Sequence, residues 1–208
     1  KKKKQKKRGR NTKDKCKIQE LQESRDGGQI GLRGYSYQFL YSCNLILSSD
    51  TNTVFTLEGI EDIDVIESVD DCREITHIQL KYSTQRQDAS FMDSVLKNYL
   101  EAYLIDKNRY FKLVYDFQVA AGNLSKLFSG NIDKKSRQFW ESKIDNIKKE
   151  TISWNWNDFN FDDFIQRLSF ENVKKESIEK SIENLLIKNF KIETDNISLF
   201  ANGIKVLC

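Results

Sequence analysis

The 208-residue chain contains no proline, a single histidine and only four cysteines, at positions 16, 43, 72 and 208. The cysteines form no CxxC pair, so their spacing argues against both a zinc site and a disulfide framework. No apolar run approaches the roughly 18 residues that a membrane-spanning helix needs, and no signal-peptide pattern opens the sequence. These absences predict a cytoplasmic protein with free thiols and no membrane partner.

Positive charge is concentrated near the N-terminus. Residues 1–17 hold 11 of the 34 Lys and Arg residues and one of the 31 acidic residues, which leaves residues 18–208 with a net charge of −7. A like-charge run is typically disordered, because it repels itself and has little apolar surface to bury. Two roles remain open for it: non-specific phosphate binding, which weakens as salt rises, or that of a solvated leader. We assign residues 1–29 to a flexible tail and linker and residues 30–208 to a folded domain.

Hydrophobic periodicity predicts a mixed α/β core. Residues 35–48 (YSYQFLYSCNLILS) are apolar nearly all round, which is typical of a helix buried against a sheet. Three short runs of β-type residues follow, VFTLE from Val54, IDVIES from Ile63 and ITHIQLKY from Ile75. The links between them are rich in Gly, Asp and Glu, so we expect three strands joined by turns.

A second helix and a fourth strand are expected next. Residues 90–107 (SFMDSVLKNYLEAYLIDK) carry apolar side chains at helical spacing, and Ser90 with Asp93 resembles an N-terminal cap. Residues 110–120 (YFKLVYDFQVA) predict a strand. A crossover helix of this length implies that the strands on either side of it pair in parallel through a right-handed connection.

The remaining periodic segments predict helices over residues 133–150, 161–170 and 173–189. The expected element order is therefore helix, three strands, helix, strand and then helices. The domain divides on this basis into a core of about residues 30–122 and a helical subdomain of about residues 123–208.

Carboxylates, a carboxamide and an ammonium group lie on or beside the three consecutive strands. Glu58, Asp62 and Asp64 accompany the first two strands, and the third carries Gln79 and Lys81. Because residues two apart in a strand point to the same side, Asp62 and Asp64 share one face, and so do Gln79 and Lys81. If the strands are neighbours, these groups converge on one patch. The plainer alternative is a solvated acidic turn beside an ordinary half-exposed strand.

A hard divalent cation suits this set of donors. Mg²⁺ takes oxygen ligands and keeps several waters, so two or three protein oxygens suffice, with Mn²⁺ as a substitute. Asp64 and Glu58 are the candidate ligands, Gln79 adds a carbonyl oxygen, and Asp62 is an alternative or helper. Lys81 can stabilise charge that develops on a phosphate, or orient and activate the attacking water. The bound ion would polarise the phosphate and lower the pKa of a bound water.

His77 and several basic residues allow more than one interpretation. His77 shares a strand face with Gln79 and Lys81, where it is either a general base or outer support of the site, or a strand-surface histidine without a catalytic part. We favour the second interpretation. Four cations are candidate phosphate contacts near the site: Arg33, Lys97, Arg109 and Lys112.

The segments GYSYQFL, TLEGIEDIDVIES and ITHIQLKYS resemble the PD-(D/E)xK nuclease superfamily, in the variant with Gln in place of the acidic residue before x-Lys. More narrowly, they resemble the double-stranded DNA endonuclease domain of bacterial anti-phage effectors. These effectors include the CD-NTase-associated nucleases of CBASS systems and relatives partnered with HerA-type ATPases or the SMC-like proteins of Lamassu systems. The resemblance covers about residues 30–120. It implies a restriction-endonuclease-like αβββαβ core within a larger effector.

The resemblance also implies site residues and partners. Gln38, in the segment that matches the family's first helix, would support the site. Because Gln replaces the acidic residue before x-Lys, the number of metal ions that the site binds, one or two, remains open. The implied partners are double-stranded DNA cut with little sequence specificity, a second copy of the chain, and defence subunits such as a sensor domain, a HerA-type ATPase or an SMC-like protein. The matching catalytic positions are Glu58, Asp62, Asp64, Gln79 and Lys81.

Two alternatives to a DNA endonuclease remain open at this stage. The first is a catalytically silent module that keeps the nuclease fold in order to dock a partner protein. The second is an RNase of the same fold. Both predict the same strands and helices, so only substrate and substitution experiments separate them from the DNA endonuclease.

Overall fold

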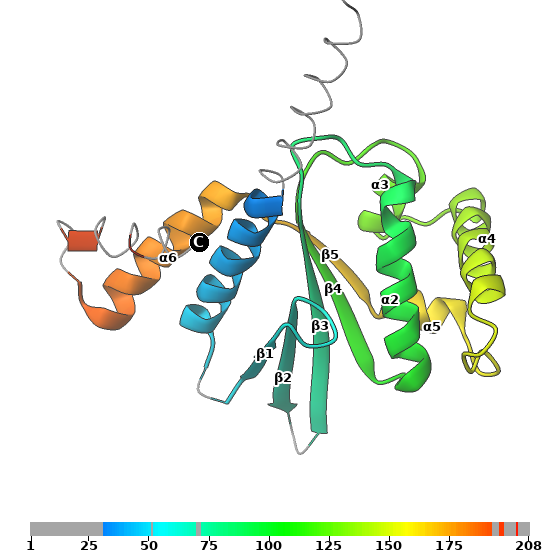
Figure 1. Cartoon of the computed structure of the whole chain (residues 1–208), viewed down its shortest axis with the longest axis horizontal. Coiled ribbons are helices and arrows are strands. Elements are labelled where there is room, and N and C mark those ends of the chain that lie inside the picture. Colours follow the sequence, from blue (N-terminus) through cyan, green and yellow to red (C-terminus); the bar gives the residue numbers. More distant parts are fainter. Residues whose placement is uncertain (1–30, 51, 70–71, 193–195, 198–202, 204–208) are drawn as a thin grey trace, which may run out of the picture. The chain divides into compact units, whose positions relative to one another are not determined.

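Figure 1 shows the computed structural model of the chain, which describes residues 31–50, 52–69, 72–192, 196–197 and 203. The basic tail predicted at residues 1–17 lies outside these residues. The chain divides into two units after Arg33. The sheet belongs to the second unit. None of the helices within the described ranges combines the length and the apolar character that a membrane crossing requires.

Five strands form one sheet, in the spatial order β1-β2-β3-β4-β5. β1, β2 and β3 pair antiparallel, whereas β3, β4 and β5 pair in parallel. The three predicted strands and the parallel pair around the crossover helix are therefore confirmed, and so is the mixed α/β class. The strands span Val54–Leu57 (β1), Ile63–Val69 (β2), Cys72–Tyr82 (β3), Arg109–Asp116 (β4) and Leu168–Asn172 (β5).

Helices cover both faces of the sheet (Figure 1). The first helix covers residues 31–48; its part from Gly34 onward lies with α6 against one face, and α2 to α5 lie toward the other. We call these the α6 face and the α2 face. The helical elements after the first span Ala89–Phe91 (η1, a 3-10 turn), Met92–Ile105 (α2), Asn123–Phe128 (α3), Lys134–Glu150 (α4), Phe161–Gln166 (α5) and Lys175–Phe190 (α6).

Each face of the sheet has its own apolar core, because successive residues of a strand point to opposite sides. Leu113 of β4 is fully buried on the α2 face, in a cluster that includes Tyr99 of α2 and Trp140 of α4. Its neighbour Val114 is fully buried on the α6 face, in a cluster that includes Leu40 of the first helix. The sheet is thus the middle of three layers.

The sequence predicts one helix over residues 161–170, but α5 ends at Gln166 and β5 begins at Leu168. Leu168 and Phe170 pack against the α2-face core, and β5 pairs with β4. This pairing satisfies backbone groups that β4 would otherwise present as an open sheet edge. The prediction of a wholly helical C-terminal half is therefore wrong.

Two boundaries also differ from the expected ones. Asp88 rather than Ser90 caps the start of η1, because the Asp88 carboxylate accepts a hydrogen bond from Ser90 N at 2.8 Å. β4 ends at Asp116, before the predicted end at residue 120. The Asp116 carboxylate accepts from Lys174 Nζ at 2.7 Å and from Lys175 N at 3.0 Å. The end of β4 is thereby tied to the start of α6.

Candidate active site

The turn between β1 and β2 is shaped around the carboxylate of Asp64 in β2. Asp64 Oδ2 accepts from Ile60 N at 2.9 Å, and Asp64 Oδ1 accepts from Glu61 N at 3.5 Å. A Cβ atom at Gly59 would lie 2.2 Å from Asp64 Oδ2, so the close approach of chain and carboxylate requires glycine there. Glu58, at the start of the turn, has a left-handed backbone with φ of 55° and an exposed side chain.

Asp62 lies immediately before β2, and hydrogen bonds hold both of its carboxylate oxygens. Oδ1 accepts from Gln38 Nε2 of the first helix at 2.9 Å, and Oδ2 accepts from Leu80 N of β3 at 2.6 Å. Because Asp62 precedes the strand, strand alternation does not apply to it. The prediction that Asp62 and Asp64 share one strand face therefore stays a prediction, because β2 includes only Asp64.

His77 of β3 is fully buried on the α2 face, directly opposite Asp64 in the β2–β3 pairing. Its Nδ1 lies 2.6 Å from Asp64 Oδ1, and its Nε2 lies 2.8 Å from Arg109 Nη1 of β4. The imidazole ring also stacks on Phe111, with 5.6 Å between ring centroids. The favoured interpretation of His77 as a strand-surface residue is therefore wrong.

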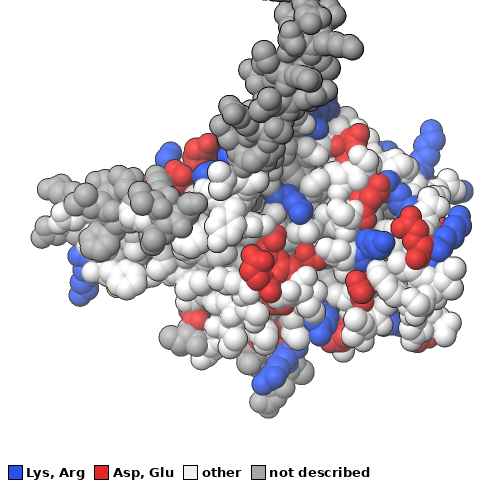
Figure 2. All heavy atoms as spheres, viewed as in Figure 1, with Lys and Arg blue, Asp and Glu red and all other residues white. Residues whose placement is uncertain are grey.

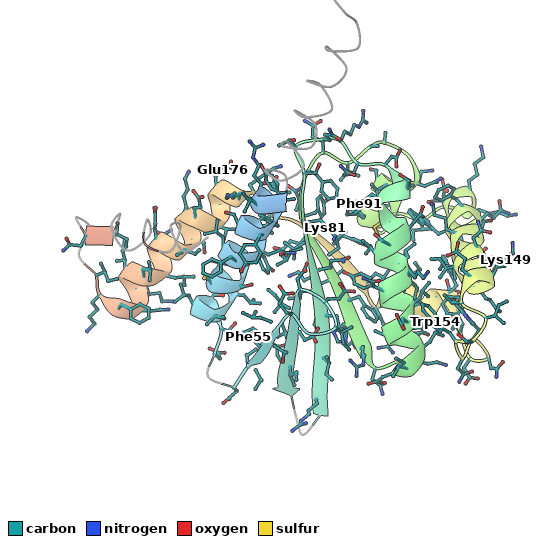
Figure 3. All side chains as sticks on the ribbon, viewed as in Figure 1. Phe55, Lys81, Phe91, Lys149, Trp154 and Glu176 are labelled. Atoms are coloured by element: carbon teal, nitrogen blue, oxygen red, sulfur yellow. The ribbon has the colours of Figure 1, made fainter. Side chains whose placement is uncertain are left out.

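Gln79 and Lys81 follow His77 on the same face of β3. Ile63 pairs with Ile78, and Asp62, the residue before Ile63, accepts from Leu80 N, so Asp62 lies beside the part of β3 that carries Gln79. Gln79 is 6% exposed, and its Oε1 is buried without a hydrogen-bond partner. Lys81 is half-buried near the end of the strand, where Figure 3 places it between the first helix and α2.

Glu61 is the site residue that the sequence did not single out. It is 7% exposed, and its Oε1 is buried without a hydrogen-bond partner. Burial, followed by the charge of Asp62, raises the pKa of Glu61 to about 7, against the opposing effects of Lys81 and of a hydrogen bond from Asn98 of α2. The sequence did contain one indication of Glu61, its position in the acidic run GIEDID. The prediction relied on residues two apart in a strand, and this criterion picked out only Asp62 and Asp64.

The electrostatics of the cluster disfavour negative charge. Burial raises the pKa of Asp62, whereas Lys81 lowers it and Glu58 raises it further. The pKa of the buried Tyr99 hydroxyl is raised well above its ordinary value, first by burial and then by Glu61 and Asp62. Figure 2 shows acidic side chains gathered over the loop between β1 and β2. A bound cation would relieve this crowding of buried acids.

The donor set fits a magnesium-type ion better than zinc. Within the described part of the chain, no three His, Cys, Asp or Glu side chains form a ready-made metal site. Among the described residues, four buried side-chain oxygens lack hydrogen-bond partners, and two of them, Glu61 Oε1 and Gln79 Oε1, belong to this cluster. Buried polar atoms in folded proteins are nearly always satisfied, and such exceptions mark the place of an ion or a water. With Asp62 these residues supply three oxygen donors, enough for an ion that retains waters.

The predicted phosphate contacts differ in their availability. Arg109 is engaged with His77 inside the protein. Lys112 points to the α6 face, where its Nζ lies 2.5 Å from a Glu171 carboxylate oxygen. Lys97 of α2 remains partly exposed, with a loose 3.6 Å ion pair to a glutamate of α4. Lys97 is therefore the most exposed of these three cations, with 45% of its side chain accessible against 20% for Arg109 and 30% for Lys112.

No protein-family model and no curated protein matches the chain. Solved structures of the Acinetobacter baumannii Cap4 SAVED/CARF-domain containing receptor do match it. The structure with the cyclic trinucleotide 3'3'3'-cAAA matches at 15% identity and a TM-score of 0.51, over 84% of this chain and 42% of that chain. The structure with 2'3'3'-cAAA matches at 16% identity and a TM-score of 0.50, over 83% of this chain and 39% of that chain. The receptor without a named ligand matches at 16% identity and a TM-score of 0.51, over 84% of this chain and 41% of that chain. The chain thus shares a fold with less than half the length of these receptors.

Proposed function

We propose that the chain is a Mg²⁺-dependent endonuclease module that cleaves double-stranded DNA within a bacterial anti-phage effector. The observation that carries this proposal is the pair of unsatisfied buried oxygens, on Glu61 and Gln79, beside Asp62 and near Lys81. Leaving such atoms unpaired lowers stability, and two of them close to an aspartate and a lysine support a ligand at this place. A divalent cation is the ligand whose chemistry suits two acids and a carboxamide.

Each residue has a definite task in the proposed site. Asp62, Glu61 and Gln79 would hold the ion, and the ion would supply polarisation of the scissile phosphate and a lowered pKa of an attacking water. Lys81 stabilises the negative charge that develops on the phosphate, or orients the water. Asp64, with its oxygens directed at the turn, positions Glu61 rather than serving as the main ligand.

Two predicted residues take outer roles in this arrangement. Gln38 fixes one oxygen of Asp62 from the first helix, so the carboxylate is held before an ion arrives. Glu58 is exposed in the turn and raises the pKa of Asp62 through its charge, so it would be available as a ligand for a second ion. One or two metal ions therefore remain compatible with the proposal.

The setting of the proposed module rests on two lines of support. Its residues resemble the endonuclease domains of anti-phage effectors, and its fold is similar to part of the Cap4 receptors. The chain matches 42% of one such receptor, so a sensor domain is a natural partner in a longer protein. Cutting both strands of a duplex needs two cleavage events, which favours a homo-oligomer or assembly with other defence subunits.

Cleavage of supercoiled plasmid tests the proposal. We expect the full chain to cut it with Mg²⁺ or Mn²⁺ and not with EDTA. Asp62→Asn and Lys81→Ala should lower the rate at least about 100-fold, because each removes a group that acts on the metal or the phosphate. Asp145→Asn and Lys135→Ala change exposed residues of α4 and serve as controls. Unchanged cleavage by both site variants would contradict the site.

Inactivity of the wild-type chain on every nucleic acid would favour the silent docking module. Cleavage of RNA alone would make the chain an RNase of the same fold. Because an effector can await activation, metal binding is measured in parallel. Calorimetric titration with Mn²⁺ should give saturable binding that Asp62→Asn abolishes, and absence of binding in the wild type would count against the metal site itself.

A second candidate function is recognition of a cyclic oligonucleotide. It is favoured by the matched receptor structures that contain 3'3'3'-cAAA and 2'3'3'-cAAA. Calorimetric titration of the chain with 3'3'3'-cAAA separates the two candidates. The nuclease proposal expects no binding, whereas binding that survives Asp62→Asn would support a separate recognition site.

A further inference from the structure

We propose that His77 and Arg109 are positioning residues for the metal-binding turn, a role that rests on the function proposed above. A continuous series of hydrogen bonds runs from β4 to that turn. Arg109 Nη1 lies 2.8 Å from His77 Nε2, and His77 Nδ1 lies 2.6 Å from Asp64 Oδ1. Asp64 in turn accepts from Ile60 N and Glu61 N. The series ends at the residue that carries one of the unsatisfied oxygens.

The chemistry of these contacts fixes the state of the imidazole. A guanidinium group has only donors, so His77 Nε2 must accept the hydrogen bond from Arg109. The single ring proton is then on Nδ1, and it is donated to the Asp64 carboxylate. The imidazole is thus held in one orientation between Arg109 and Asp64. Metal sites commonly use such an outer partner to orient a carboxylate that itself orients the ligands.

Packing holds the same arrangement from the other directions. His77 is fully buried and stacks on Phe111, which is itself fully buried. Arg109 is held in place by Asp106, whose Oδ2 lies 3.3 Å from Arg109 Nε. On the far side, Gly59 leaves no room between the turn and Asp64 Oδ2. The carboxylate therefore has one position, and the turn that carries Glu61 follows it.

Two substitutions at one residue separate positioning from bulk packing. His77→Phe keeps a ring on Phe111 but removes both hydrogen bonds. His77→Gln keeps a donor for Asp64 and an acceptor for Arg109, because a carboxamide has one of each. We expect His77→Phe to weaken Mn²⁺ binding about 10- to 100-fold, the usual cost of losing an outer partner, and His77→Gln to restore most of it. Arg109→Met should weaken binding several-fold.

Phe164→Leu is the matched control, because Phe164 packs on Phe111 in the same core without contacting the turn. Mn²⁺ affinity is measured by calorimetry on the full chain, well below the unfolding temperature of every variant. If Phe164→Leu weakens binding as much as His77→Phe, or if His77→Phe binds as the wild type does, the inference is overturned. If Arg109→Met binds Mn²⁺ with the affinity of the wild type, Arg109 is not a positioning residue.

Amide hydrogen exchange provides a test that needs no metal. The amides of Ile60 and Glu61 should be protected in the wild type and in His77→Gln, and should exchange at least about 10-fold faster in His77→Phe. Protection that is unaffected by His77→Phe would overturn the inference. Failure of the wild type to bind Mn²⁺ while this exchange pattern holds would instead count against the proposed function alone.

Discussion

β3 presents opposite characters to the two layers of helices that enclose it. Toward the α6 face it places Ile78 and Leu80, which are nearly inaccessible and belong to a wholly apolar cluster. Toward the α2 face it places His77, Gln79 and Lys81, of which the first two are buried polar groups. The apolar side chains need no hydrogen-bond partner, whereas the buried Gln79 oxygen needs one and has none. One face of the strand therefore stabilises the fold, whereas the other carries buried polar groups that we assign to the proposed site.

The largest expected effect is a loss of stability when the apolar face of β3 is disrupted. Ile78→Ala should lower the free energy of unfolding by about 2–5 kcal/mol, because it removes buried methyl groups and leaves a cavity between the sheet and the helices of the α6 face. Urea unfolding measures the change. The Mn²⁺ affinity of the folded variant should equal that of the wild type, because Ile78 faces away from the site. A loss of affinity at Ile78→Ala would show that the two faces are coupled.

The next effect concerns the buried acid of the α2 face. The pKa of Glu61 is raised to about 7 by burial, from 4.5. A folded pKa above the unfolded one means that the folded state holds the proton more tightly. The cost of a buried charge is then fully present above pH 7 and absent below pH 4.5. As pH falls from 8 to 5, the free energy of unfolding of the wild type should therefore rise by up to about 3 kcal/mol relative to that of Glu61→Gln.

Thermal unfolding of both chains across that pH range measures the difference, because the other titrating groups are common to them. Saturating Mg²⁺ should reduce the pH dependence of the wild type, since the ion stabilises the same charge that burial penalises. Stability profiles that stay parallel from pH 8 to pH 5 would mean that Glu61 is better solvated than its 7% exposure indicates.

Sequence reasoning worked where a pattern repeats along one element. The strand alternation in ITHIQLKY and the helical spacing after Ser90 each depend on local periods, and β3 and α2 follow them. The parallel pairing followed from the length of the crossover. β5 was missed because LSFEN is too short to signal a strand without the edge of β4 as its partner.

The site was only partly predictable for a related reason. Gln79 and Lys81 obey strand alternation, so their common face was evident from the sequence. Glu61 lies in a turn whose shape depends on hydrogen bonds to the Asp64 carboxylate. Such contacts leave no helical or strand periodicity in the sequence. The burial of His77 likewise depends on Arg109 and Phe111, which are distant in the sequence. Contacts of this kind become visible only when the strands are paired.

The smallest expected effect is a gain in stability when a polar residue on the α2 face of β3 is replaced by an apolar one, as on the α6 face. Gln79→Leu replaces a buried carboxamide, whose oxygen has no partner, with an apolar group of similar size. Relieving one unsatisfied polar atom should raise the free energy of unfolding by about 1 kcal/mol while cleavage and Mn²⁺ binding fall. Urea unfolding and calorimetry measure the two effects, with Gln138→Leu on the exposed side of α4 as the control. A variant that loses stability would mean that Gln79 is held by contacts within the fold, and the assignment of its oxygen to a cation would fail.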